Sequence, residues 1–181
     1  HPGLPSQLAY LEGKEFANYL HDMKIAQEYA KYNRKAIVNE ISMRMEFYEQ
    51  EQFTTVHNYI NINDMILRKG AISARKGEKV LIPINMRDGS LICIGKGNPD
   101  WNYSAPHGAG RIMSRRKARE AITLEEFKQT MINVYSTTVS KETLDECALA
   151  YKPMDEIIEN IKDTVEIIDV IHPIYNFKAK E

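Results

Sequence analysis

The chain has 181 residues and a formal net charge of −1, with 43% hydrophobic and 27% charged residues. This composition is typical of a globular protein and argues against disorder, and the charge excludes a general attraction to nucleic acid. Any nucleic-acid surface must therefore be a local patch. The sequence has no apolar run of the ~20 residues that cross a bilayer. With only two distant cysteines, Cys93 and Cys147, we expect a cytoplasmic protein without a membrane partner.

The first predicted element is a long helix. Between Lys14 and Glu49 the chain has no Gly or Pro, and apolar residues recur at spacings of three and four. This pattern predicts one long amphipathic helix or two abutting helices. The apolar positions are Phe16, Leu20, Met23, Ala26, Ala30, Ile37, Ile41 and Met45.

The middle of the chain, residues 53–95, is predicted to be mostly sheet. Residues 53–62 are rich in β-branched and aromatic side chains, and residues 64–74 predict two short strands around Lys69-Gly70. The apolar runs 79–84 and 90–95 flank an Asp-Gly turn and predict a hairpin.

The last third predicts short helices and a closing strand. Ser114 is placed to cap a helix at 115–121, and Thr123 with Glu126 forms a capping-box pattern. A further helix is predicted at 153–163, followed by a strand-like run that contains Pro173. Without repeats or a linker, we expect one α+β domain over 1–181, a long helix followed by a mostly antiparallel or mixed sheet with short helices.

The sharpest chemical feature is the stretch "SAPHGAGRIMSRRKA", residues 104–118. A neutral imidazole such as His107 can attack phosphorus, and glycines at 108 and 110 let backbone N–H groups approach phosphates. Arg111 and Arg115 lie four apart, so they share a face if the segment is helical, and both can neutralise phosphate charge. A tight surface turn followed by a solvated basic helix explains the same pattern equally well.

Two weaker candidates lie in the predicted sheet. His57, followed by Asn58, is either a metal ligand or a structural strand histidine. Arg68 and Lys69, next to Gly70, form either a phosphate clamp or a hairpin tip with solvated charges. The pattern alone does not choose between these alternatives.

Several blocks in a fixed order carry a family resemblance. They are "VHNYI", "RKGAI", "GEKVLIP", the HGAGR-x-x-SR block, "YKPMDEIIE" and "PIYNFKA". Over nearly its whole length the chain resembles the C-terminal half of the RtcB family of RNA-splicing ligases. The resemblance implies joining of RNA 3′-phosphate or 2′,3′-cyclic phosphate ends to 5′-hydroxyl ends, in RNA repair or tRNA splicing. It implies GTP and Mn²⁺ as cofactors and a covalent histidine–GMP intermediate.

The resemblance also implies roles for single residues. His107 matches the guanylylated histidine, and His57 matches a Mn²⁺ ligand. Arg111, Arg115 and Lys69 match residues that act on the phosphates. The nucleotide would be bound by Ser90, His107, Gly108, Ala109, Gly110, Tyr151 and Lys178, with Tyr151 and Lys178 at the guanine base.

The chain departs from the family pattern at several points. "PINMR", residues 83–87, replaces the usual Pro-Gly-Ser-Met-Gly, and Ser73 replaces an Arg, so contacts there are expected to differ. The stretch "NPDWNYSAPHGAGR", residues 98–111, resembles a divergent branch that occurs beside a release-factor-like protein. The family's upstream metal ligands, an Asp, a Cys and two His, have no match before His21.

We therefore expect a C-terminal portion without its N-terminal metal-ligand half. Alone it should fold, be inactive and self-associate through the face that the missing half would cover. The alternatives are a non-catalytic nucleotide- or RNA-binding module, or an inactive fragment of the ligase.

Overall fold

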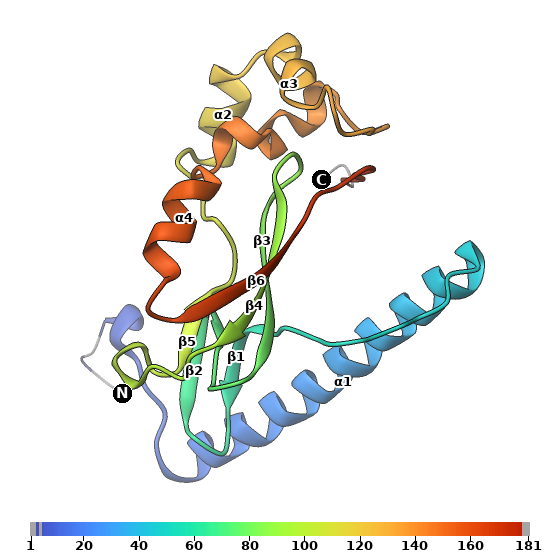
Figure 1. The fold of residues 1–181 in the computed structure, drawn as a ribbon. Coiled ribbons are helices and arrows are strands. Elements are labelled where there is room, and N and C mark those ends of the chain that lie inside the picture. Colours follow the sequence, from blue (N-terminus) through green and yellow to red (C-terminus); the bar gives the residue numbers. More distant parts are fainter. Residues whose placement is uncertain (1–2, 4, 179–181) are drawn as a thin grey trace. The chain divides into compact units, whose positions relative to one another are not determined.

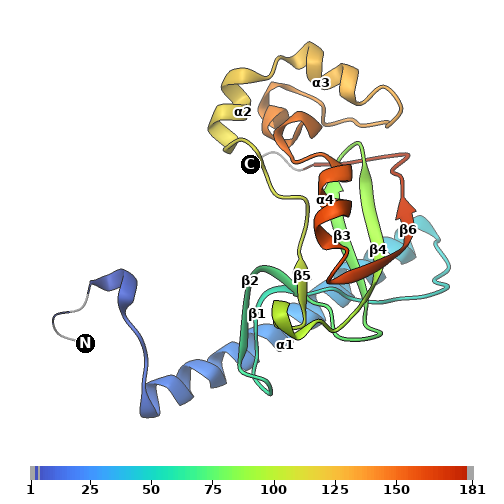
Figure 2. The ribbon, with the colours of Figure 1, turned by 60° about the vertical axis from the view of Figure 1, so that its left-hand side comes forward.

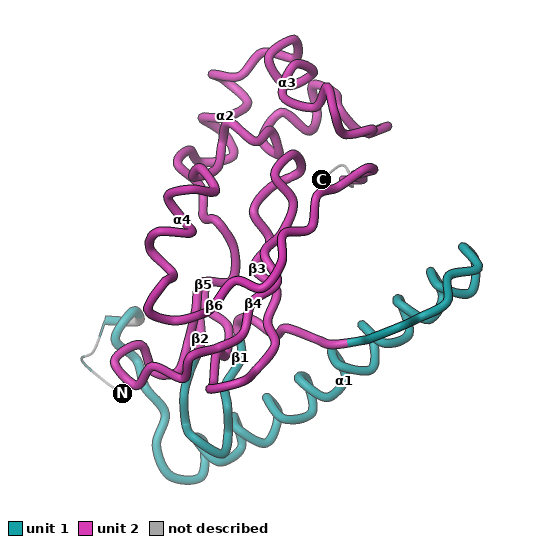
Figure 3. Tube along the Cα trace, viewed as in Figure 1, with its two compact units in different colours: residues 1–52, 59–67 teal, residues 53–58, 68–181 magenta. Residues whose placement is uncertain are grey.

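The computed structural model describes residue 3 and residues 5–178. The chain divides into two compact units (Figure 3). Unit 1 comprises residues 1–52 and 59–67, and unit 2 comprises residues 53–58 and 68–181.

Unit 1 is dominated by α1 (Gly13–Met45), which follows the short 3₁₀ helix η1 (Ser6–Leu8) (Figure 1). The helix ends where Glu46 takes a left-handed conformation, with φ of 54°, and the N–H of Phe47 donates to the carbonyl of Ser42. The predicted long helix is confirmed, ending four residues early. None of its residues is buried, and Ile37 and Ile41 are each 51% exposed.

The main sheet of unit 2 is antiparallel and has the order β3-β4-β6. The predicted hairpin is confirmed, because β3 (Lys79–Asn85) and β4 (Gly89–Gly95) pair around a tight turn. On its other edge β4 pairs with β6 (Val165–Ile171), which ends two residues before Pro173. Gly89, at the start of β4, lies so close to β6 that an added Cβ would meet the carbonyl oxygen of Ile171 at 1.9 Å.

A second sheet has the order β1-β2-β5, formed by β1 (His57–Asn61), β2 (Ile66–Ser73) and β5 (Ser104–Pro106). The predicted break at Gly70 is wrong. One strand, β2, runs through Gly70, which adopts a φ of +69° while its N–H donates to the side chain of Asn58. Pairing with β5 begins at the next residue, Ala71, so the strand continues through the left-handed glycine.

The short helices of unit 2 begin at the predicted caps. The side chain of Ser114 accepts a hydrogen bond at the start of α2, and Thr123 with Glu126 forms the capping box of α3. The helices and 3₁₀ turns are η2 (Pro99–Trp101), α2 (Arg115–Ala121), α3 (Leu124–Thr130), η3 (Lys141–Glu146), η4 (Ala148–Ala150) and α4 (Met154–Ile161).

Unit 2 contains two hydrophobic clusters. In the first, Ile157 of α4 packs with Ile82 and Leu91 of the main sheet, and α4 lies beside this sheet in Figure 2. The second cluster joins the short helices and includes Phe127. Tyr151 packs against both clusters. Within the described part of the chain, no helix combines the length and apolar character that crossing a membrane requires.

Candidate active site

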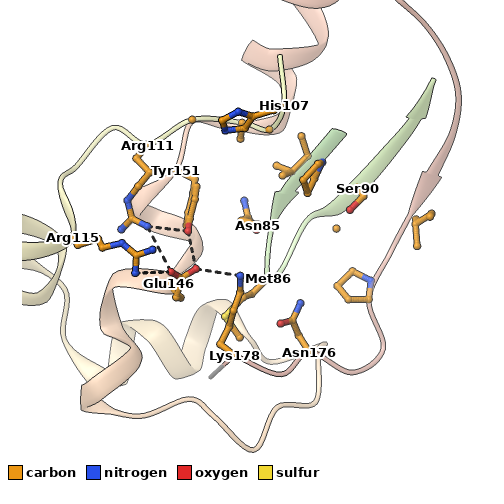
Figure 4. A pocket seen from close by; sticks show the side chains of 18 residues that line it. Asn85, Met86, Ser90, His107, Arg111, Arg115, Glu146, Tyr151, Asn176 and Lys178 are labelled. Carbon is orange, nitrogen blue, oxygen red and sulfur yellow. Dashed lines mark hydrogen bonds and ion pairs between the residues drawn. The ribbon is translucent and has the colours of Figure 1, made fainter. Parts of the chain in front are cut away.

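A pocket of about 460 Å³ lies in unit 2, where the loop after β5 meets the β3–β4 turn and the end of η3 (Figure 4). Nine of the eleven residues predicted for the site line it, and His57 and Lys69 do not. These nine are Ser90, His107, Gly108, Ala109, Gly110, Arg111, Arg115, Tyr151 and Lys178. Sequence reasoning missed four other polar or flexible lining residues, Asn85, Met86, Glu146 and Asn176.

His107 follows β5 directly and is partly buried. Its N–H donates to the carbonyl oxygen of Gly70 at 3.4 Å, which ties the histidine to the left-handed residue of β2. The Nδ1 atom of His107 is buried and has no hydrogen-bond partner among the described residues. The ring of His57 stands nearly edge-on, with 5.0 Å between the two ring centroids. The second sheet thus brings the two predicted histidines together.

The surroundings of His107 favour its neutral form. Burial, followed by the nearby His57 and the charge of Lys69, lowers the pKa of His107 below its usual value. A neutral imidazole keeps a lone pair on one nitrogen, which is the form that attacks an electrophile. Lys69 is exposed on β2 and acts on His107 through its charge, although it does not line the pocket.

The glycine-containing loop lies tightly against the end of β3. The N–H of Ala109 donates to the carbonyl oxygen of Pro83 at 3.1 Å, and an added Cβ on Gly108 would lie 3.0 Å from the same oxygen. Gly110 adopts a φ of +73°. The glycines therefore allow close packing and a left-handed turn, and the N–H of Ala109 serves the protein rather than a phosphate.

Arg111 and Arg115 do not share a helix face as the four-residue spacing suggested, because α2 begins only at Arg115. They converge instead on the end of η3. Arg111 donates to the hydroxyl of Tyr151 at 2.9 Å and to the backbone carbonyl of Asp145. Arg115 contacts Asp145 Oδ2 at 3.0 Å and Glu146 Oε1 at 3.4 Å.

The carboxylate of Glu146 joins the two predicted base-contacting residues. The hydroxyl of Tyr151 donates to Glu146 Oε2 at 2.8 Å, and Lys178 Nζ lies 3.3 Å from the same oxygen. Burial and the hydrogen bond to Glu146 raise the pKa of Tyr151 to about 12, so the phenol keeps its proton. The available sequence signal was the acidic pair Asp145-Glu146 inside an otherwise uncharged stretch, residues 143–150.

Arg68 is neither a phosphate clamp nor a solvated hairpin charge. Only 2% of its surface is exposed, and its guanidinium donates to Ser104 Oγ at 2.9 Å and to the carbonyl oxygen of Asn102 at 3.1 Å. It therefore holds the loop that leads into β5 and so to His107.

The residues described here do not form a complete metal site. Among them no group of three or more His, Cys, Asp or Glu side chains lies close enough to hold an ion. His57 is exposed beside His107 and supplies one imidazole. Mn²⁺ prefers six ligands, mostly oxygen, so the donor set on these residues does not fit a whole manganese site.

The fold is α+β, and its pocket places the partly buried His107 together with cationic side chains. Residues 4–179 match the family described as "tRNA-splicing ligase RtcB". The chain is 33% identical to the RNA-splicing ligase RtcB of Escherichia coli K12 over 196 residues, covering 97% of this chain and 48% of that protein. It is 29% identical to the tRNA-splicing ligase RtcB of Aeropyrum pernix over 182 residues, which cover 80% of this chain and 38% of that protein.

The chain therefore belongs to the RtcB family. It spans about half the length of the curated relatives it matches.

Proposed function

We propose that this chain provides the nucleotide-binding and covalent-catalysis part of an RNA ligase. The reaction joins an RNA 3′-phosphate or 2′,3′-cyclic phosphate end to a 5′-hydroxyl end, in RNA repair or tRNA splicing, with GTP as the energy source. The observation that carries the proposal is His107, a partly buried imidazole of lowered pKa in a pocket lined by Arg111, Arg115 and Lys178. Family membership supports RNA as the substrate class.

In the first step a ring nitrogen of His107 attacks the α-phosphorus of GTP. A nitrogen–phosphorus bond forms, the bond from that phosphorus to the bridging oxygen of the β-phosphate breaks, and pyrophosphate leaves with the electron pair. The lowered pKa of His107 supports this role, because the attacking nitrogen then needs no deprotonation at neutral pH.

A 2′,3′-cyclic phosphate end is first opened by water to a 3′-phosphate. An oxygen of the RNA 3′-phosphate then attacks the phosphorus of the GMP group on His107, and the nitrogen–phosphorus bond breaks. The 5′-hydroxyl then attacks that phosphate and GMP leaves. Arg111 and Arg115 lie at the pocket and Lys69 lies beside His107, so we assign them to the charge that moves through these steps. Gly108, Ala109 and Gly110 follow His107 in the pocket wall, and Ser90 lines the pocket from β4. We assign the end formed by Tyr151 and Lys178 to the guanine base.

We assign Mn²⁺ as the metal and His57 as one of its ligands, on the strength of the position of His57 beside His107. When bound, the ion would neutralise phosphate charge. Because the described residues supply no complete ligand set, we derive no step through the metal. For the same reason we expect residues 1–181 alone to fold without forming the adduct.

The test is formation of an acid-labile adduct from α-labelled GTP by the full-length gene product. His107→Ala should abolish the adduct and the ligation of 3′-phosphate to 5′-hydroxyl RNA. His21→Ala is the matched control, because His21 is exposed on α1 and should label normally. An adduct that survives His107→Ala overturns the assignment. Nucleotide binding without any adduct would identify a binding module instead.

A further inference from the structure

The wall of the pocket opposite His107 contains one carboxylate among three cations. The side chain of Glu146 is 13% exposed and lies at the end of η3, surrounded by Arg111, Arg115 and Lys178 (Figure 4). A carboxylate is not expected in a pocket for polyphosphates, because it repels them. A carboxylate at this place therefore needs a role that outweighs the repulsion.

The contacts of Glu146 form a chain of hydrogen bonds. Arg111 Nη1 donates to the hydroxyl of Tyr151 at 2.9 Å, and this hydroxyl donates to Glu146 Oε2 at 2.8 Å. The guanidinium of Arg111 also lies over the ring of Tyr151, 4.7 Å from its centroid. These contacts fix the orientation of the Tyr151 phenol and keep its proton in place. Protein groups occupy its one donor position and one of its acceptor positions.

Lys178 is fixed at both ends. Its backbone N–H donates to Thr138 Oγ1 at 3.0 Å, and its ammonium lies 3.3 Å from Glu146 Oε2. A single carboxylate oxygen therefore sets the distance between the Tyr151 hydroxyl and the Lys178 ammonium. An ammonium has only donors, so a fixed Lys178 donates a hydrogen bond to a ligand oxygen and disfavours a ligand amino group at the same place.

We propose that Glu146 is a positioning residue for nucleobase selection, acting through Tyr151 and Lys178. It does not touch the reacting atoms. This inference rests on the proposed function, because it concerns the base end of the same pocket. Guanine carries an oxygen at C6 and adenine carries an amino group there, so the fixed ammonium favours GTP over ATP. The carboxylate limits the pocket's cationic excess, which alone would bind any nucleoside triphosphate.

The main test uses Glu146→Gln, which keeps the size of the side chain and removes its charge. Binding of GTP and of ATP is measured by calorimetry in Mn²⁺ buffer on the full-length gene product. The preference for GTP should fall by about tenfold, with ATP binding unchanged or stronger. Glu159→Gln is the matched control, because Glu159 forms an exposed ion pair with Lys162 and does not line the pocket. An equal loss of both nucleotides, or an unchanged preference, overturns the proposal.

A second readout does not need nucleotide. In protein labelled at the tyrosine ζ-carbon, NMR follows the ionisation of each phenol, and the Tyr151→Phe spectrum identifies the Tyr151 signal. In Glu146→Gln the pKa of Tyr151 should fall from about 12 toward the ordinary value of ~10. An unchanged titration overturns the positioning role, even if Glu146→Gln weakens GTP. If the unaltered protein shows no GTP preference, the proposed function fails, while the titration still decides whether Glu146 holds Tyr151.

Discussion

Replacing Gly89 by alanine should destabilise unit 2 strongly. Gly89 has a φ of +86°, where an L side chain is strained, and its added Cβ would meet the carbonyl oxygen of Ile171 at 1.9 Å. Real Cβ atoms do not approach another atom below 3.0 Å, so β6 must move away by about 1 Å. The clashing atom belongs to the backbone of β6, which cannot change rotamer as a flexible side chain can. The movement would disturb the pairing of Ser90 with Ile171 and displace Pro173, both next to the pocket.

The size of the effect follows from a comparison with Gly77. Gly77 has a φ of +81° and nothing within 4 Å of an added Cβ, so Gly77→Ala reports the backbone strain alone. That strain destabilises the folded state by roughly 1–2 kcal/mol. Alanine also makes the unfolded chain less flexible, which offsets ~0.4–1 kcal/mol of this loss. Gly89→Ala adds the loss of one or two strand hydrogen bonds, at ~0.5–1.5 kcal/mol each. We expect a loss of about 3 kcal/mol for Gly89→Ala and about 1 kcal/mol for Gly77→Ala.

Urea unfolding of both variants, followed by far-ultraviolet circular dichroism, measures these differences. Trp101, the only tryptophan of the chain, gives an independent fluorescence signal. The reasoning would be refuted if Gly89→Ala were no less stable than Gly77→Ala. That result would mean that β6 does not lie against Gly89 in solution.

Two further predictions concern charge. Lys69→Gln should move the acid limb of the pH–rate profile for adduct formation to higher pH, because Lys69 helps to lower the pKa of His107. A shift of this limb to lower pH would contradict the assignment. Asp145→Asn should cost about 1.5–3 kcal/mol of unfolding free energy at neutral pH, because this buried carboxylate pairs with Arg115 and Arg119 at 3.0 Å each. Burial raises the pKa of Asp145, yet the two arginines lower it overall, so this stability is present above the ordinary pKa of ~3.9 and disappears as the pH falls through the lowered value. Equal urea midpoints for Asp145→Asn and for Asp163→Asn, a change at an exposed position, would exclude the effect.

Local signals in the sequence were sufficient for much of the fold. The helix starts at Ser114 and Thr123 followed from side chains that accept hydrogen bonds from their own helix, and the β3–β4 hairpin followed from its Asp-Gly turn. The break predicted at Gly70 failed because glycine is both a strand breaker and a residue that lets a strand bend. The deciding contacts, to Asn58 and His107, come from other segments and leave no local trace.

In the candidate site too, residues with a local sequence signal could be predicted, and residues defined by distant contacts could not. The residues around His107 were recognisable because glycines and arginines gather within one short stretch of sequence. Arg68 looked like a surface charge beside Lys69, and only the loop at residues 102–104 shows that it is buried. Glu146 was missed because its partners lie up to 35 positions away in the sequence and meet only through the fold.

Tyr151 packs against both hydrophobic clusters of unit 2, and this contact bears on how cooperatively the unit unfolds. The pocket lies at the seam between the two clusters, with Ala109 from the first and Met86 from the second in its lining. A ligand that fills the pocket contacts both clusters at once, so opening either one would cost binding energy. A bound nucleotide would then couple the two clusters, so that both parts of unit 2 unfold together. Without it, hydrogen exchange should distinguish two blocks of different stability.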